Sequence, residues 1–265
     1  MRTGGHGRHH TILVLVALTA TALVGCSTRG QAAWQHLRDT RVLRVGMDAS
    51  LPPFEAVSED GSLVGLDVDL AREVSRRLGL EPQFVANLPY DGLYDALTAQ
   101  RVDVVFSALV INPARTADFS YSAPYFDAGE VLVIRTGAHE IRSVADLNGC
   151  RLAVVLGSQG DLEARRWSRR MENLSVSQHQ TPEGVLQVVE GGLADIALVD
   201  HVSALQATGA GYNLAISGEP VVSVPYAAAV LTESRHLLRA INDALRAMED
   251  DGTTDKLVAR WILGN

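Results

Sequence analysis

The feature of this 265-residue sequence that most constrains its fold is an alternation, from Val42 onward, of short β-branched runs with segments of helical periodicity. The first half contains three predicted strands, at Val42–Val45, Gln83–Ala86 and Val102–Phe106. Two predicted helices lie between them, Asp67–Leu78, with Asp67 as its N-cap, and Asp91–Ala99. This order predicts parallel strands with right-handed crossovers, which place a ligand crevice at the carboxyl ends of the strands.

The second half of the sequence repeats this scheme. Its predicted strands are Leu152–Leu156, Leu174–Ser177 and Ile196–Val199. Ser143 and Asp146 have the spacing of a capping box at the start of a short helix, and Thr181 precedes a proline at the first position of another. A further helix should begin near Asp161. We therefore expect two similar α/β lobes.

The first 26 residues have the pattern of an export signal. Two arginines precede an uncharged run, Thr11–Gly25, of about 15 residues, which is shorter than the roughly 20 that a transmembrane helix needs. The segment Leu23–Cys26 (LVGC) resembles the lipobox of bacterial lipoproteins. We expect residues 1–25 to be a signal peptide, Cys26 to be lipid-modified and residues 26–36 to form a tether. A secreted protein with an incidental cysteine is the alternative.

Composition and charge exclude several classes of protein. Hydrophobic residues make up 47% of the chain and charged residues 20%, which is typical of a folded chain rather than a disordered one. The formal net charge of -8 argues against a general nucleic-acid binder. The two cysteines, Cys26 and Cys150, cannot form a disulfide framework or the thiolate cluster of a structural zinc site. Cys150 is expected to be an inert core residue.

Short motifs follow one another along the chain in an order typical of one protein family. They are Val42–Asp48, Pro52–Glu55, Gly65–Ala71, Tyr90–Leu93, Asp103–Val105, Ile111–Arg115, Phe119-Ser120, Pro124-Tyr125, Gly157-Ser158, Asp195, Asp200, Asp251–Thr253 and Trp261. Together they resemble family 3 of the bacterial extracellular solute-binding proteins, which are the receptors of polar amino-acid ABC importers. The resemblance covers about Leu37–Gly264.

The resemblance implies a two-lobed, type II periplasmic-binding-protein-like α/β fold. Each lobe would be a mostly parallel sheet flanked by helices, and two hinge strands would join the lobes. Lobe 1 is expected to comprise residues 37–126 and 224–265, and lobe 2 residues 127–223. The chain would return to lobe 1 through a strand at Val221–Leu231 and helices at Leu237–Met248 and Thr254–Ile262.

Membership of this family would make the protein a receptor that captures an amino-acid-like ligand between closing lobes and delivers it to an ABC import permease. It would work as a monomer outside the cytoplasmic membrane, anchored there by its lipid, with no cofactor and no nucleic-acid partner. Asp67 and Asp69 are not expected to bind a metal, because their side chains do not share a helix face. A dehydratase-like enzyme acting on arogenate or prephenate and a ligand-presenting sensory component remain alternatives. Against catalysis, His179 and His201 are isolated in the sequence and no nucleophile elbow is recognisable.

Arg115 is the first candidate for binding the carboxylate of a ligand. It follows Asn112 and Pro113, an N-cap and a proline that open a helix with free backbone amides. A planar guanidinium can hold a carboxylate through two parallel hydrogen bonds, and the family uses the matching arginine for this purpose. The alternative role of Arg115 is a surface ion pair.

The resemblance adds residues from both lobes. Asp48 and Asp200 follow predicted strands, and the family uses the residue matching Asp200 to hold the α-ammonium group of the ligand in a pocket that Asp48 would also line. Either aspartate could instead cap a helix or a turn. Tyr90 matches an aromatic wall of the cleft or, alternatively, a buried core tyrosine. Ser158 and Gln159 match a lobe 2 loop that contacts the ligand, or else form a plain strand-to-helix turn.

Ala108, Val110 and Leu51 complete the predicted binding set, and two of them depart from the family. Val110 replaces the usual Ser or Thr, which removes a hydroxyl donor for the carboxylate but keeps the backbone N–H. Leu51 replaces an aromatic residue that often stacks on the ligand. Both changes make the cleft more aliphatic, which favours a bulkier or more apolar amino acid, or a related carboxylate, over glutamine or histidine.

Overall fold

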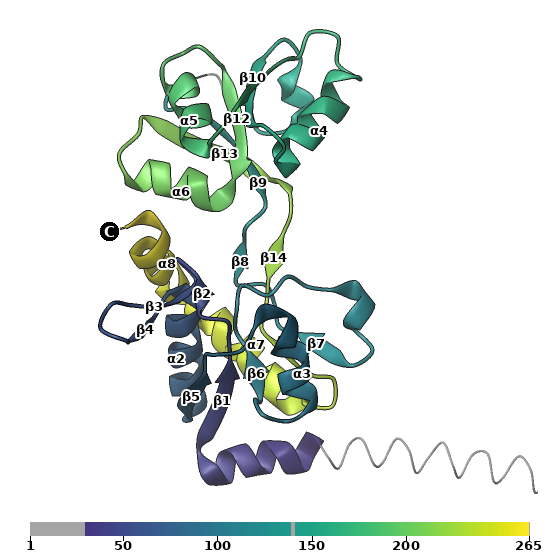
Figure 1. Cartoon of the computed structure of the whole chain (residues 1–265), viewed down its shortest axis with the longest axis vertical. Helices are drawn as coiled ribbons and strands as arrows, with labels where there is room; N and C mark the ends of the chain where they lie inside the picture. The colour runs from purple at the N-terminus through teal and green to yellow at the C-terminus, as the bar shows by residue number, and fades with distance from the viewer. Residues whose placement is uncertain (1–29, 139–140, 265) are drawn as a thin grey trace, which may run out of the picture.

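The structure is a computed structural model that describes residues 30–138 and 141–264, and it has two α/β lobes joined by extended strands (Figure 1). The predicted signal peptide and Cys26 lie outside the described residues. Within residues 30–138 and 141–264, no helix is both long and apolar enough to span a membrane. Residues 30–40 belong to a helix at the end of lobe 1 that is remote from lobe 2, where Trp34 and Leu37 pack against the lobe 1 core.

Lobe 1 is built on a five-stranded sheet in the order β5-β1-β6-β15-β7. Its strands are β1 (Val42–Gly46), β5 (Glu81–Val85), β6 (Val104–Val105), β7 (Phe119–Tyr121) and β15 (Ala229–Leu231). As the sequence predicts, β1 pairs with β5 and β6 in parallel. Strand β15 comes from the C-terminal part of the chain and pairs in antiparallel fashion with β6 and β7.

Three helices each bury an apolar face in the lobe 1 core: α2 (Leu66–Leu78), α3 (Leu93–Thr98) and α7 (Arg235–Asp250). Helix α8 (Thr253–Val258) packs against α2 and α7. Leu70 and Val74 of α2 are four residues apart and are both buried in the core cluster that includes α7. The predicted end of α2 at Leu78 is confirmed, and Gly79, the glycine that follows, closes the helix in the left-handed conformation. Asp67, however, is not the N-cap. Gly65 precedes the helix, and Asp67 is buried within its first turn.

Lobe 2 is built on a second five-stranded sheet in the order β11-β10-β12-β9-β13. Its strands are β9 (Glu130–Arg135), β10 (Arg151–Val155), β11 (Ser175–His179), β12 (Ile196–Asp200) and β13 (Leu214–Val222), and its helices are α4 (Gln159–Ser168), α5 (Pro182–Glu190) and α6 (His201–Gly209). The apolar run of β12 is explained by burial on both faces. Ile196 and Leu198 pack in the cluster that contains Ala164 of α4, whereas Ala197 and Val199 pack in the cluster that contains Val185 of α5.

The helix starts that the sequence predicts in lobe 2 are confirmed. Ser143 and Asp146 form a capping box at a short 3-10 helix, η3 (Val144–Leu147). The hydroxyl of Thr181 accepts the N–H of Gly184 at 3.2 Å, and proline occupies the first position of α5. Local hydrogen bonding is therefore sufficient to locate these starts from the sequence.

Two extended segments join the lobes, and β8 (Phe126–Asp127) pairs with β14 (Pro225–Tyr226) in antiparallel fashion between them (Figure 1). At Gly129 a side chain has no room, because a Cβ atom would lie 1.8 Å from the carbonyl oxygen of Val222. The two connections are therefore held side by side. This arrangement confirms the two-lobed α/β fold with two hinge strands.

Helix α6 of lobe 2 makes a further contact with lobe 1. Val202 and Leu205 of α6 pack against the lobe 1 core, and the C-terminal helical turn η4 (Ala259–Leu263) contacts the same helix. A Cβ atom on Gly209 would lie 2.2 Å from the carbonyl oxygen of Leu263, so the two segments meet backbone to backbone.

Other predicted elements differ from the structure where the chain changes partner. The single strand predicted at Val221–Leu231 is wrong: Val222 pairs with Glu130 in lobe 2, β14 pairs with β8, and Ala229 pairs with Val105 in lobe 1. The helix predicted at Asp91–Ala99 begins as a 3-10 turn, η1 (Tyr90–Gly92), before α3. The remaining strands, β2 (Ser50–Leu51), β3 (Glu55–Val57) and β4 (Leu63–Val64), form a small sheet beside α2.

Candidate functional site

The residues predicted to bind a ligand fall into two groups, one in each lobe, and each group reaches the hinge. In lobe 1, Val110 forms a β-bridge with Tyr226 of hinge strand β14. In lobe 2, Asp200 pairs with Glu130, three residues after hinge strand β8. Among the described residues, no hydrogen bond or ion pair links Asp48, Tyr90 or Val110 with the lobe 2 group.

Asp48 holds the lobe 1 loops together. Its Oδ2 atom accepts the backbone N–H of Tyr90 at 3.0 Å, and its own N–H donates to the hydroxyl of Ser107 at 2.9 Å. Asp48 also forms a β-bridge with Asn87. The loops after β1, β5 and β6 thus meet at Asp48, through its carboxylate and its backbone N–H. Contact between Asp48 and a ligand stays a prediction.

Three of the predicted residues expose apolar surface. Leu51 is 43% exposed, Tyr90 41% and Val110 39%. Tyr90 and Val110 line a pocket of about 260 Å³ together with Tyr94, Leu109, Ile111, Asn112 and Pro113. Burial raises the pKa of Tyr90, and the backbone N–H of Val110 opposes this shift. A small, mainly apolar pocket with two tyrosine rings suits a hydrophobic side chain better than a charged one.

Arg115 does not line this small pocket. The N-cap at Asn112 is as predicted, because the Asn112 side chain accepts the N–H of Ala114 at 3.0 Å, but the element that follows is only a 3-10 turn, η2 (Pro113–Arg115). The predicted α-helical turn with free amides is therefore wrong. The guanidinium of Arg115 lies 4.5 Å from the centre of the Tyr94 ring, in a cation–π contact at the edge of the pocket.

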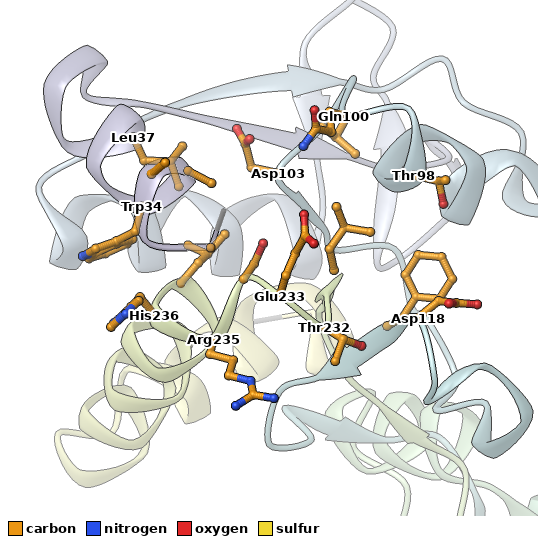
Figure 2. A pocket seen from close by; sticks show the side chains of 18 of the residues that line it. Trp34, Leu37, Thr98, Gln100, Asp103, Asp118, Thr232, Glu233, Arg235 and His236 are labelled. Carbon is orange, nitrogen blue, oxygen red and sulfur yellow. The ribbon is translucent and has the colours of Figure 1, made fainter. Parts of the chain in front are cut away.

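A second, larger cavity of about 1430 Å³ lies in lobe 1 between the N-terminal helix and the start of α7 (Figure 2). Arg115 contributes to its wall, as do Trp34, Gln100, Asp118 and His236. It is at the end of lobe 1 that carries the N-terminal helix, so it does not combine residues of the two lobes. Of the residues predicted to bind a ligand, this cavity therefore contains Arg115 alone.

In lobe 2 the predicted side chains are all engaged at helix starts. Ser158 caps α4 by accepting the N–H of Asp161 at 3.1 Å. Gln159 donates to Glu163 at 3.3 Å. Asp200 caps α6, where it accepts the N–H and the hydroxyl of Ser203 at 2.9 and 2.7 Å. These contacts fix the positions of the side chains, and binding of a ligand by them stays a prediction.

Glu130 was not predicted from the sequence, yet it lies beside the lobe 2 group. Its side chain is 7% exposed, and its buried Oε2 atom has no hydrogen-bond partner among residues 30–138 and 141–264. Burial raises the pKa of Glu130, the N–H of Gly160 lowers it, and the charge of Asp200 raises it further. The available signal was a glutamate directly before the buried run Val131–Ile134, where an acidic residue is rarely placed.

Two further acidic residues behind the lobe 1 loops were also missed. Glu55 accepts the hydroxyl of Ser107 at 2.8 Å, and Asp67 accepts the backbone N–H of Ala108 and, at 2.8 Å, the hydroxyl of Tyr125. Both acidic side chains are fully buried. Their motifs were recognised, but the position of Asp67 at a helix start favoured an N-cap over a buried carboxyl group.

Comparison with known proteins agrees with this architecture. The family described as "Bacterial extracellular solute-binding proteins, family 3" matches residues 43–264. The L-cystine-binding protein TcyJ of Escherichia coli (strain K12) is 28% identical over 255 residues, which cover 94% of each chain. The putative amino-acid ABC transporter-binding protein PatH of Vibrio harveyi is 30% identical over 253 residues, covering 94% of this chain and 96% of that protein.

A solved structure supports the fold and shows that an enzyme can have a similar one. An ancestral cyclohexadienyl dehydratase superposes with a TM-score of 0.73 and 25% identity, covering 86% of this chain and 95% of that one. The fold is thus similar to that of an enzyme, while the relatives named above are binding proteins. Because the family match spans residues 43–264, this chain belongs to family 3 of the bacterial extracellular solute-binding proteins.

Proposed function

We propose that this protein is the receptor of an ABC importer, which captures an amino acid between its lobes and delivers it to the permease. The observation that carries the proposal is the position of the two residue groups at the two ends of the hinge, with Val110 beside β14 and Asp200 beside Glu130. Rotation about two short strands can bring such groups together around a small molecule. The family and its amino-acid-binding relatives support the same reading.

The ligand we propose is an α-amino acid with an apolar side chain. Arg115 of lobe 1 is the proposed partner of its carboxylate, and Asp200 of lobe 2 is the proposed partner of its ammonium group. One zwitterion would then pair with the positive charge in one lobe and with the negative charge in the other. The side chain would lie against Tyr90 and Val110, whose pocket of about 260 Å³ is mainly apolar. Arg115 would have to turn from the Tyr94 ring toward the cleft, a movement that its exposed position allows.

The proposed site of action is the outer side of the cytoplasmic membrane. Cys26 at the end of the hydrophobic run would carry the lipid, and the protein would act there as a monomer. A single anchored receptor needs only its own two lobes to enclose the ligand.

The proposal includes no catalytic step. In lobe 2, Ser158 and Asp200 are hydrogen-bonded to the starts of α4 and α6, as expected of residues that hold a loop in place. The similarity to a dehydratase is tested by incubating the protein with prephenate and measuring phenylpyruvate. We expect none above the uncatalysed rate.

A thermal-shift and calorimetry panel tests the binding function. L-leucine is expected to stabilise the protein. L-leucinamide, which lacks the carboxylate, and 4-methylpentanoate, which lacks the ammonium group, are expected to stabilise it much less. A ligand specific for the folded state adds RT ln(1 + [L]/Kd), about 2.7 kcal/mol at a hundredfold excess over Kd. Absence of stabilisation by every standard L-amino acid would refute the proposal.

A further inference from the structure

The buried carboxyl groups of Glu55 and Asp67 are brought together by the close approach of β3 to the start of α2. A Cβ atom on Gly65 would lie 2.1 Å from the carbonyl oxygen of Phe54, and Gly65 has a φ of 133°. The N–H of Asp67 donates to the same carbonyl oxygen at 2.9 Å. Only glycine allows this contact, so the motif that contains Gly65 and Asp67 brings the start of α2 against β3, where the side chains of Glu55 and Asp67 interact.

Each carboxyl group uses one oxygen to hold the lobe 1 loops and has one oxygen left over. Glu55 Oε1 accepts the hydroxyl of Ser107, whose oxygen accepts the N–H of Asp48. Asp67 Oδ2 accepts the N–H of Ala108, which has a left-handed φ of 42°. The remaining oxygens, Glu55 Oε2 and Asp67 Oδ1, are buried and accept no hydrogen bond from any donor among the described residues.

Two adjacent anions at this place would be uncompensated. Neither Glu55 nor Asp67 forms an ion pair within the described part of the chain. Burying one unpaired charge is costly, and a second like charge in contact raises that cost. A single proton between Glu55 Oε2 and Asp67 Oδ1 would remove one charge and would give both leftover oxygens a partner.

The hydrogen bonds indicate which group carries the proton. Asp67 accepts from two donors, Ala108 and Tyr125, and lies in the first turn of α2, where the helix dipole favours an anion. Glu55 accepts from the hydroxyl of Ser107 only. Burial raises the pKa of both carboxyl groups, and the charge of Asp67 raises that of Glu55 further. Glu55 therefore donates to an ionised Asp67.

The groups that face the pair from other elements do not supply a positive charge. They are Asp48 after β1, Tyr90 in η1, Tyr125 before β8 and Tyr226 in β14, all of them acidic or neutral. Burial raises the pKa of Tyr125 far above its ordinary value, so its hydroxyl keeps its proton for Asp67. The pair itself is thus the acidic site here whose pKa is raised by burial, and for Glu55 by the charge of its neighbour as well.

We propose that Glu55 and Asp67 share one proton and act together as positioning residues that hold Ser107 and Ala108 in the conformation needed to bind a ligand. The positioning role rests on the proposed function, because Ala108, Val110 and Asp48 belong to the predicted binding set. Loss of the shared proton creates two adjacent anions, and repulsion between them displaces the two loops that they hold. Ligand affinity therefore falls when the pair is deprotonated.

The sign of the pH effect follows from the direction of the shift. Because the pKa values in the folded state are raised, the pair contributes its full stability below the ordinary pKa of a carboxyl group. This stability is lost as the pH rises through the pKa values that the two carboxyl groups have in the folded state. Since the two groups are coupled, the loss belongs to the pair and not to either residue alone.

Infrared and carboxyl-carbon NMR spectra of the ligand-free wild-type protein test the shared proton directly. At pH 7 we expect the pair to contribute one protonated carboxyl group, seen as a C=O stretching band that deuterium oxide shifts. Glu55→Gln replaces the O–H donor by an N–H donor and should remove the band while preserving the hydrogen bond to Asp67. Glu59→Gln is the control, because Glu59 is an exposed glutamate on the β3–β4 hairpin and its replacement should leave the band unchanged.

Two further measurements test the link to the binding loop. The amide resonance of Ala108 should titrate together with the carboxyl carbons in the wild-type protein and should not move in Glu55→Gln. One pH unit above this titration only about a tenth of the molecules keep the proton, so affinity for L-leucine should fall about tenfold relative to Glu55→Gln. The comparison with Glu55→Gln removes the titration of the ammonium group of L-leucine itself.

The possible results separate this proposal from the proposed function. If both carboxyl carbons are fully ionised at pH 7, the shared proton is refuted, whether or not L-leucine binds and whether or not Glu55→Gln folds. If the proton is present but the Ala108 resonance does not titrate with it, the positioning role is refuted. If the pair behaves as expected and no L-amino acid binds, the amino-acid receptor is the part that fails.

Discussion

Asp127 in one hinge strand accepts the backbone N–H of Val224 in the other connection at 2.8 Å, so one carboxylate ties together the two links between the lobes. The same group accepts the hydroxyl of Ser223 at 2.6 Å and the N–H of Gly129 at 2.8 Å. Burial alone would raise the pKa of Asp127, but these donors and the nearby His201 outweigh it and hold the pKa below its ordinary value. The hinge is therefore fastened by an ionised side chain.

Asp127→Asn should destabilise the protein at pH 7 and by a smaller amount at pH 3. Asparagine can still accept the N–H bonds, yet hydrogen bonds to a charged acceptor are stronger, so we expect a loss of about 1 kcal/mol in the free energy of unfolding. A lowered folded-state pKa gives stability that is present above the unfolded value, about 3.9, and is lost as the pH falls through the folded value. Urea denaturation at both pH values checks this. Asp250→Asn, at the exposed end of α7, is the control and should show no such pH dependence.

Cys26→Ala should prevent lipid modification and release the protein from the membrane without unfolding it. The expectation rests on the hydrophobic run that ends in Leu23–Cys26. Membrane fractionation and mass spectrometry of the mature N-terminus provide the readout, with Cys150→Ala as the matched control. An unmodified N-terminus at another residue in the wild-type protein would contradict the lipoprotein assignment.

An amino acid that contacts both lobes should make the molecule more compact. Such a ligand binds the closed state more tightly than the open state and shifts the population by that difference in affinity. Small-angle scattering should show a smaller radius of gyration with saturating L-leucine, and no change with 4-methylpentanoate at the same concentration. If saturating L-leucine leaves the radius unchanged, closure of the lobes around the ligand is excluded.

The sequence predicts the elements that depend on local interactions. The cap at Thr181, the left-handed Gly79 and the buried run Ile196–Val199 can each be recognised from a few neighbouring residues. The division of Val221–Leu231 among three partners could not, because it depends on the path of the chain from one lobe to the other. Periodicity carries no information about a change of pairing partner within one extended segment.

The candidate site shows the same distinction. Asp48, Tyr90 and Val110 lie together in lobe 1 because strand ends gather at one edge of a parallel sheet. The roles of Glu55 and Asp67 could not be predicted, since they depend on contacts between β3, α2 and the loop after β6 that are far apart in the sequence. An aspartate near a helix start is more often a cap than half of a buried carboxyl pair.

Arg115→Ala should weaken binding of L-leucine by roughly a hundredfold or more. In the closed cleft the carboxylate would lose its partner while remaining out of water, at a cost of about 3 to 5 kcal/mol, and about 1.4 kcal/mol corresponds to a factor of ten. Arg115 is exposed in η2, so the melting temperature should hardly change. Arg101→Ala, at an exposed turn after α3, is the control for calorimetry. Unchanged affinity in Arg115→Ala would mean that the ligand carboxylate lies elsewhere.

Val110→Thr should strengthen binding of L-leucine, and only if the carboxylate lies beside this residue. The change restores a hydroxyl donor at nearly constant volume, at a side chain that is 39% exposed beside the hinge. A hydrogen bond to a charged group contributes about 1 kcal/mol or more, which is roughly a fivefold gain in affinity. Val57→Thr, on β3 with 59% exposure, is the matched control and should have no effect.

In the Arg115→Ala background the gain in affinity from Val110→Thr should shrink, because both residues would act on the same carboxylate and neighbouring contacts are not additive. A gain of equal size in both backgrounds would show instead that the threonine acts on another part of the ligand.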